Sequence, residues 1–317
     1  MKHNNIKGSL ILCTAALIWG LAFVAQSDAA ELIPPFTVNA LRSFIGAAAL
    51  YVFYLVTTRG KKPFLPAEKP VRKQFYIAAL ICGFMLAVSV NLQQFGLAAY
   101  PDGAAAAARG GFITALYVVL VPVFSFFAGK KISAVIWVSV AVALAGFYLL
   151  CLSGGAGGIY IGDVLIFICA VSFSFHIMSV DKFVGITGGI RLSVMQFTVV
   201  GILSAVLALI FEKPVLSDII AAAPQILYLG IMSSGVAYTL QIVGQKYAEP
   251  SVASLSMSLE SVFAALGGWL ISGNVLKAQE FVGCALVFAA IIAAQLPEIL
   301  SSKGKKSSVK NQDQCKI

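Results

Sequence analysis

Charged side chains are scarce in this sequence. Asp, Glu, Lys and Arg make up 11% of its 317 residues, whereas hydrophobic residues make up 60% and the mean hydropathy is +0.93. Soluble domains use about 25% charged residues and about 45–50% apolar ones. Water is therefore excluded as the solvent for most of this surface, and with it an ordinary soluble globular domain.

Acidic residues are the scarcer kind: 13 Asp and Glu stand against 22 Lys and Arg, which gives a net charge of +9. A positive excess can indicate nucleic-acid binding. Here the basic residues fall between apolar stretches, where they lie beside anionic lipid head groups. We therefore expect the lipid bilayer and a small-molecule substrate as partners, and no nucleic acid.

Several enzyme motifs are missing. Gly129-Lys130-Lys131 lacks the first glycine and the hydroxyl of a phosphate-binding loop, and the sequence contains no His-Glu-x-x-His and no Gly-x-Ser-x-Gly. Five of the six cysteines lie inside apolar stretches, without disulfide or metal-site spacing. We expect no enzyme, no cofactor and no metal, and a driving force that comes from solute or ion gradients.

Long apolar stretches are abundant instead. They run for about 18 to 24 residues, long enough as helices to cross a hydrocarbon core about 30 Å thick. The first stretch, behind Lys2 and Lys7, resembles a signal peptide, but nine comparable segments follow. The sequence predicts an all-α integral membrane protein with ten spans, at residues 8–27, 36–57, 75–95, 103–128, 133–152, 161–180, 190–211, 223–245, 250–272 and 277–296.

The basic residues predict the orientation, because loops rich in Lys and Arg stay in the cytoplasm. An even number of spans puts both termini on one side. If that side is the cytoplasm, the opposite face keeps only Lys213 and Lys277. We expect a multi-pass protein of the cell membrane with both termini cytoplasmic and a disordered basic tail at 299–317.

The two halves of the sequence align with each other. We expect two inverted five-helix repeats, 1–155 and 156–298, because five spans are odd in number and the second half enters the membrane reversed. Such repeats place the substrate near the midplane and allow alternating access. A shift of 147 superimposes Gly83 on Gly230, Met85 on Met232, Gln94 on Gln241 and Tyr100 on Tyr247; shifts of 154 and 144 align the flanking spans.

Two segments resemble a known family. Residues Gly111 to Pro122 and Leu259 to Gly273, with Trp19-Gly20 and Arg42, are similar to the EamA-type branch of the drug/metabolite transporter superfamily over residues 8–296. The resemblance implies the ten-span fold and carriage of amino acids, other metabolites or drugs, with efflux favoured. Ser261 and Asn274 depart from the family, which often has proline and an acidic residue there.

Four ionisable residues fall inside the predicted spans and well away from their ends: Arg42, Arg109, His176 and Glu260. Such groups usually face a cavity or a partner. From the rise per residue of a helix, Arg109 and Glu260 differ in depth in the membrane by only about 7 Å. We therefore expect them to form an ion pair, which either binds a zwitterionic solute or is broken by it. Alternatively, either arginine reaches the outer interface, and Glu260 is a protonated packing residue.

Polar residues at helical spacing predict the site. Asn91 and Gln94 occupy positions that match those of Tyr238 and Gln241 in the other half, which favours a cavity over helix packing. His176 suits proton coupling but is more often a core histidine. The predicted substrate-binding residues are Trp19, Asn91, Gln94, Arg109, Tyr238, Gln241 and Glu260, with His176 and Glu260 for proton coupling and Pro122 as a hinge.

These observations favour a secondary carrier of small metabolites or drugs that works by alternating access as an exporter. A membrane channel or a scaffold without carrier turnover is the alternative. A membrane-bound enzyme would need catalytic residues that the motifs do not supply. The sequence does not define the oligomeric state.

The orientation can be tested with topology reporters. A reporter at Lys61 or in the tail is expected to read cytoplasmic, and one near Gly157 external, because the basic loops hold the termini inside. Alkaline phosphatase and fluorescent-protein fusions at the same sites measure this. Reversed signals would overturn the orientation.

Overall fold

A computed structural model describes residues 5–61, 63–101, 106–151, 159–272, 278–279 and 281–294. Within these ranges all the regular structure is helical, which confirms the all-α class. The predicted tail and the loop around Gly157 lie outside the described residues.

Helices occupy all ten predicted ranges in the described part of the chain. Seven of them are long and apolar enough to cross a membrane, whereas helices Ala134–Leu149 and Phe281–Ala294 are shorter. The ten-span count therefore stays a prediction. The elements are α1 Asn5–Leu32, α2 Pro35–Thr58, α3 Lys69–Ala98, α4 Ala106–Thr114, α5 Tyr117–Phe127, α6 Ala134–Cys151, α7 Ile161–Thr187, α8 Gly189–Phe211, α9 Leu216–Ala221, α10 Ala223–Leu227, η1 Tyr228–Ala237, α11 Tyr238–Gln245, α12 Pro250–Met257 and α13 Glu260–Ser272.

Proline and glycine set several of the helix boundaries. Pro35 and Pro250 are the first residues of α2 and α12, where the missing N–H costs no helical hydrogen bond. Gly188 separates α7 from α8 with a φ of 74°, a conformation that favours glycine. Such residues divide an apolar sequence into spans of defined length.

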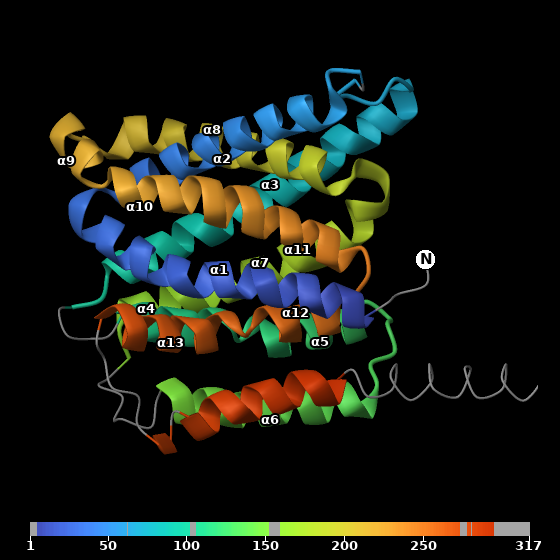
Figure 1. Ribbon diagram of the computed structural model, residues 1–317, viewed down its shortest axis with the longest axis vertical. Helices are drawn as coiled ribbons and strands as arrows, with labels where there is room; N and C mark the ends of the chain where they lie inside the picture. The colour runs from blue at the N-terminus through green and yellow to red at the C-terminus, as the bar shows by residue number, and fades with distance from the viewer. Residues whose placement is uncertain are drawn as a thin grey trace, which may run out of the picture.

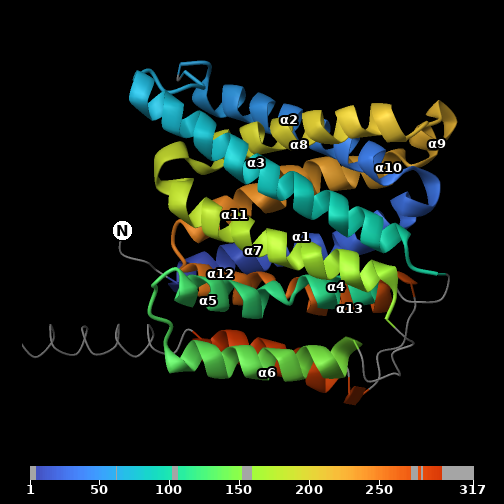
Figure 2. The same ribbon diagram turned by 180° about the vertical axis from the view of Figure 1, so that it is seen from behind.

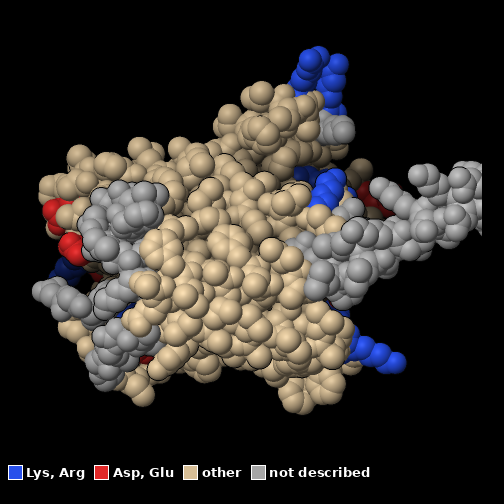
Figure 3. Space-filling view, turned by 60° about the horizontal axis from the view of Figure 1, so that its bottom comes forward, with Lys and Arg blue, Asp and Glu red and all other residues tan. Residues whose placement is uncertain are grey.

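The helices are arranged as a bundle around α1. In Figures 1 and 2, α6 and the helix Phe281–Ala294 lie together at one edge, while α2, α3 and α8 form the opposite side. α1 packs against η1, α11, α12 and α13, and α3 packs against α7 and α8. The face seen in Figure 3 has few charged residues, with Lys and Arg mainly at one end, as expected of a surface that meets lipid.

Two helices approach closely because they carry glycine at the contact. A Cβ atom added to Gly46 of α2 would lie 2.8 Å from the carbonyl oxygen of Gly230 and 2.9 Å from Cβ of Ser234, both in η1. Real Cβ atoms do not approach so closely, so only glycine fits here. Small residues at helix contacts are typical of membrane bundles, where close packing replaces the hydrophobic effect.

The fourth and ninth predicted spans are each broken near the middle. The chain turns at Ala115–Leu116 between α4 and α5, and at Ser258–Leu259 between α12 and α13. Pro122 lies inside α5, where it has no N–H for the carbonyl four residues earlier and crowds it. The first break thus lies between about one and two helical turns before Pro122, on the N-terminal side, where a proline disturbs a helix.

The predicted hinge can be tested with Pro122→Ala. Restoring the N–H at this position favours a continuous helix, so the variant is expected to transport several-fold more slowly while its abundance changes little. Transport and membrane abundance are measured together, with Pro214→Ala as a control outside the broken span. Equal losses of rate and abundance would instead indicate a role in folding.

Candidate functional site: a central polar pocket

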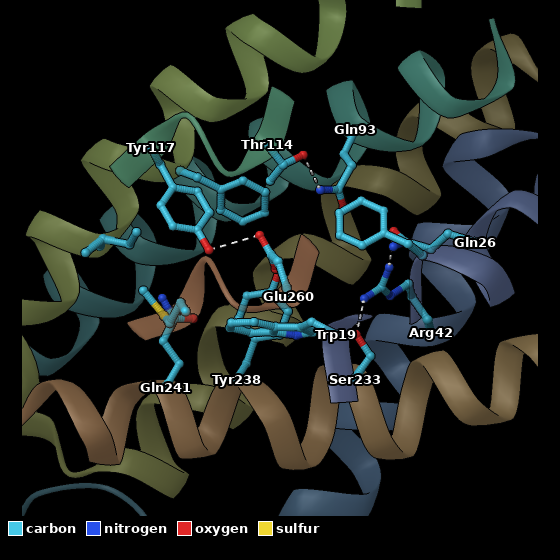
Figure 4. Close-up of a pocket in the computed structure, with 14 residues that line it drawn as sticks. Trp19, Gln26, Arg42, Gln93, Thr114, Tyr117, Ser233, Tyr238, Gln241 and Glu260 are labelled. Carbon is cyan, nitrogen blue, oxygen red and sulfur yellow. Dashed lines mark hydrogen bonds between the residues drawn. The ribbon is translucent and has the colours of Figure 1, made fainter. Parts of the chain in front are cut away.

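A buried pocket lies where the two broken spans meet α1, α2 and α11. The cavity open to water-sized spheres is about 30 Å³, room for about two water molecules, so a larger solute needs the lining side chains to move apart. Figure 4 shows side chains from both halves pointing into it. The lining residues are Trp19, Phe23, Gln26, Arg42, Gln93, Thr114, Tyr117, Phe173, Ile177, Ser233, Tyr238, Gln241, Met257 and Glu260.

Arg42 supplies the positive charge of the pocket. Its side chain comes from α2, and the residue is only 3% exposed. The guanidinium donates from Nε to Ser234 Oγ (3.1 Å), from Nη1 to Gln26 Oε1 (3.0 Å) and from Nη2 to Ser233 Oγ (2.9 Å). All three acceptors are neutral, so Arg42 joins α1, α2 and η1 without a carboxylate partner in the described part of the chain. The alternative that Arg42 reaches the membrane interface is wrong.

Glu260 supplies the negative charge. It is the first residue of α13, directly after the break in the ninth predicted span, and it is 5% exposed. Tyr117, the first residue of α5, donates a hydrogen bond from its hydroxyl to Glu260 Oε1 at 2.9 Å. The residues that follow the two helix breaks therefore contact each other at the centre of the bundle (Figure 4).

Aromatic and amide groups form the remaining wall. The rings of Trp19 and Tyr238 pack edge to face with centroids 4.7 Å apart, a favourable geometry for aromatic pairs. Gln93 donates to Thr114 Oγ1 at 3.2 Å, and Gln241 is 2% exposed. The pocket is thus a mainly apolar cavity with a few polar groups placed at its edges.

The predicted Arg109–Glu260 pair is wrong. Arg109 lies near the start of α4 and pairs with Asp163 of α7, with Nη2–Oδ2 at 2.6 Å and Nε–Oδ1 at 3.1 Å. The prediction compared depths only, whereas the direction in which Arg109 leaves α4 turns it toward α7 and away from α13. Arg109 and Asp163 line a separate surface cavity.

Tyr100 strengthens this ionic cluster. Its hydroxyl donates to Asp163 Oδ1 at 2.7 Å, and burial together with this carboxylate raises the pKa of Tyr100. Tyr100 also packs on an apolar cluster whose buried members are Phe23, Leu97, Ile166 and Ala264. Because Phe23 lines the pocket, the apolar cluster separates the pocket from the ionic cluster at the end of the bundle away from the N-terminus.

Two further predicted residues do not line the pocket. Asn91 lies between α2, α3 and α8, where it accepts from Asn39 at 3.1 Å and donates to Ser204 at 3.0 Å. Gln94 donates to the carbonyl oxygen of Gln26 at 3.0 Å, behind the pocket wall. Its neighbour Gln93 faces the cavity instead, because one residue along a helix turns the side chain by about 100°.

His176 is fully buried in α7, with Nε2 3.2 Å from Gln196 Oε1. Its ring lies against that of Tyr238, with centroids 6.4 Å apart, but His176 does not line the pocket. The geometry favours the core-histidine alternative. Trp19, Tyr238, Gln241 and Glu260 are the predicted site residues that the structure brings together.

Several lining residues are not predictable from the sequence patterns above. Thr114 and Tyr117 stand inside the family-like segment Gly111 to Pro122, which drew attention to the segment but not to these side chains. Ser233 lies in the π-helix η1, and π-helical turns often occur at functional sites. An α-helical projection cannot assign the facing residues of such a segment.

A bundle of apolar helices around a buried pocket that holds a few polar groups is the architecture of a multi-pass membrane transporter. The chain belongs to the EamA-like transporter family, whose model matches residues 6–152 and again residues 160–294. The predicted resemblance is confirmed.

Relatives and a solved structure agree with this assignment. An uncharacterized transporter of Archaeoglobus fulgidus is 30% identical over 92% of this chain and 87% of its own. The uncharacterized inner membrane transporter YedA of Escherichia coli K12 is 25% identical over 90% and 89% of the two chains. One crystal structure, 22% identical, shares the fold with a TM-score of 0.71 over 91% of this chain and 98% of its own.

The Arg109–Asp163 pair predicts a measurable coupling. Arg109→Gln and Asp163→Asn are each expected to lower the unfolding temperature, and the double variant to cost less than the sum, by about 1 kcal/mol. Thermal unfolding in detergent measures the cycle. The exposed pair Lys130–Asp181, whose lysine is 49% exposed, is the control, since such pairs couple weakly. Strictly additive effects at Arg109 and Asp163 would contradict the prediction.

Proposed function

We propose that this chain is a secondary carrier that moves a small metabolite, such as an amino acid, or a drug across the membrane by alternating access. The observation that carries the proposal is the composition of the pocket wall. Trp19, Arg42 and Tyr117 come from residues 1–155, and Tyr238 and Glu260 from residues 156–298. A site shared by two halves changes its access when the halves move against each other.

The two halves act as inverted repeats in this proposal. The family model matches once in each half. Equivalent helices also make equivalent contacts: α3 of the first half packs on α7, as η1 and α11 of the second half pack on α1. The fourth and ninth spans are both broken beside the pocket. These features support ten spans in two repeats of opposite orientation.

The helix breaks provide the moving parts. The hydrogen bond from Tyr117 to Glu260 joins α5 to α13 directly after each break. A solute that takes one of these two groups as its own partner opens this contact. Binding and a change in helix direction are thereby linked, which a carrier needs and a passive channel does not.

Glu260 is the group that we assign to proton coupling. It is buried, it has one hydrogen bond to Tyr117, and neither of the two ion pairs found among the described residues includes it. A carboxyl group in such a place can alternate between a proton and a solute as its partner. Export and cytoplasmic termini complete the proposal; they rest on the family resemblance and on the distribution of basic residues.

The carrier proposal is tested in proteoliposomes. Radiolabelled L-amino acids, supplied as a panel, are expected to enter in a saturable way, and entry to be accelerated by unlabelled amino acid inside. Linear uptake without counterflow, for every member of the panel, would indicate a channel or scaffold instead. The protein must be monodisperse in detergent before it is reconstituted into the vesicles.

A proton role for Glu260 is tested by Glu260→Gln in the same vesicles. The amide keeps the shape of the side chain but cannot release a proton. The variant is expected to retain solute exchange while losing acceleration by a pH gradient. Asp181→Asn, which lies in the Lys130 pair outside the pocket, is the matched control. A Glu260→Gln carrier that still follows the pH gradient would remove the assignment.

A further inference from the structure

The guanidinium of Arg42 is not fully satisfied by its protein neighbours. A guanidinium has five N–H donors, and three of them bond to Gln26, Ser233 and Ser234. Neither of the two ion pairs in the described ranges includes Arg42. A nearly buried cation with free donors faces the pocket, and a buried charge is costly without a partner.

Trp19 gives a second, independent observation in the same pocket. Its indole Nε1 is buried and has no hydrogen-bond acceptor among the described residues. Figure 4 shows the indole beside Tyr238 and Glu260, in the pocket that Arg42 also lines. An indole N–H can only donate, so the Trp19 N–H and the two remaining N–H groups of Arg42 need an acceptor that neither residue can supply to the other.

We infer that Arg42 and Trp19 form a subsite for a carboxylate group of the transported solute. The inference rests on the proposed carrier function and assigns the anionic end of the substrate to Arg42. A planar carboxylate matches the fork of a guanidinium and accepts from both of its free donors. An ammonium group at this position would meet a fixed positive charge.

The wall beside the subsite selects the rest of the solute. The rings of Trp19, Phe23, Phe173 and Tyr238 line the same pocket as Arg42 and Glu260. Such surfaces bind apolar or aromatic groups. The geometry therefore favours a small carboxylic acid with an apolar or aromatic body, and an amino group on it is an addition rather than the main determinant.

A matched series of solutes tests the subsite on the wild-type protein. The probes are 3-phenylpropionate, L-phenylalanine, phenethylamine and 3-phenylpropan-1-ol, which share the ring and differ in the charged end. The two carboxylates are expected to raise the unfolding temperature by about 2 °C or more, since a ligand stabilises the state that it binds. Equal stabilisation by the alcohol or the amine, or none by either carboxylate, would overturn the inference.

Variants link the effect to Arg42. Arg42→Lys keeps the charge but loses the forked geometry. It is expected to need about tenfold more 3-phenylpropionate to reach half of the maximal rise in unfolding temperature. Arg191→Lys, outside the pocket, is the matched control and should behave as wild type. If Arg42→Lys fails to fold, Trp19→Phe, which removes only the indole donor, replaces it with the same expectation. If the variant that folds needs no more 3-phenylpropionate than the wild type for the same rise in unfolding temperature, the subsite is overturned.

The two proposals fail separately. Stabilisation by carboxylates without counterflow of any amino acid would remove the carrier function and retain the anion subsite. Counterflow together with equal stabilisation by the acid and the alcohol would retain the carrier and remove the subsite.

Discussion

Burial of the Arg42 guanidinium constrains the structure around the pocket. A charge at this depth in a bilayer needs polar partners, and three oxygens from α1 and η1 provide them. The glycine contact between Gly46 and η1 lies one turn further along α2 and brings the two helices close enough for Nε of Arg42 to reach Ser234. The π-helical geometry of η1 helps, because its wider turn reduces the angle between the consecutive serines and lets both face α2. Charge, close packing and an uncommon helix form are thus parts of one arrangement.

The second arrangement joins the two helix breaks. Tyr117 and Glu260 lie at the first positions of α5 and α13, each directly after a two-residue turn. Gly20 allows α1 to pass close to this point: a Cβ atom there would lie 2.8 Å from the carbonyl oxygen of Glu260. The same Trp19-Gly20 pair therefore supplies a pocket wall and a close helix contact. Trp19 thus supplies the pocket wall, and Gly20 supplies the space for the close contact with α13.

Hydropathy and family-like segments were enough to predict the helical class, the membrane setting and the family, because these depend on properties averaged over many residues. The pocket was predicted only in part. Glu260 is predicted because few charged groups lie at mid-span, and Tyr238 and Gln241 because they match Asn91 and Gln94 in the other half. The Arg109–Glu260 pair is wrong because depth along the membrane normal leaves rotation about the helix axis undetermined. Gln94 does not line the pocket, because a matching position in the two halves does not define which side chain faces a cavity. The break before Pro122 has a local cause, whereas no proline marks the break at Ser258–Leu259 or the segment η1.

The cover of the pocket has two layers of different chemistry. Above Phe23, Leu97, Ile166 and Ala264 lies the partly exposed ionic cluster of Arg109, Asp163 and Tyr100. Dissolved salt weakens exposed ion pairs by screening, whereas salts such as sulfate strengthen the burial of apolar surface. A sulfate salt is therefore expected to weaken the ion pair of Arg109 and Asp163 while it strengthens the apolar packing beneath it.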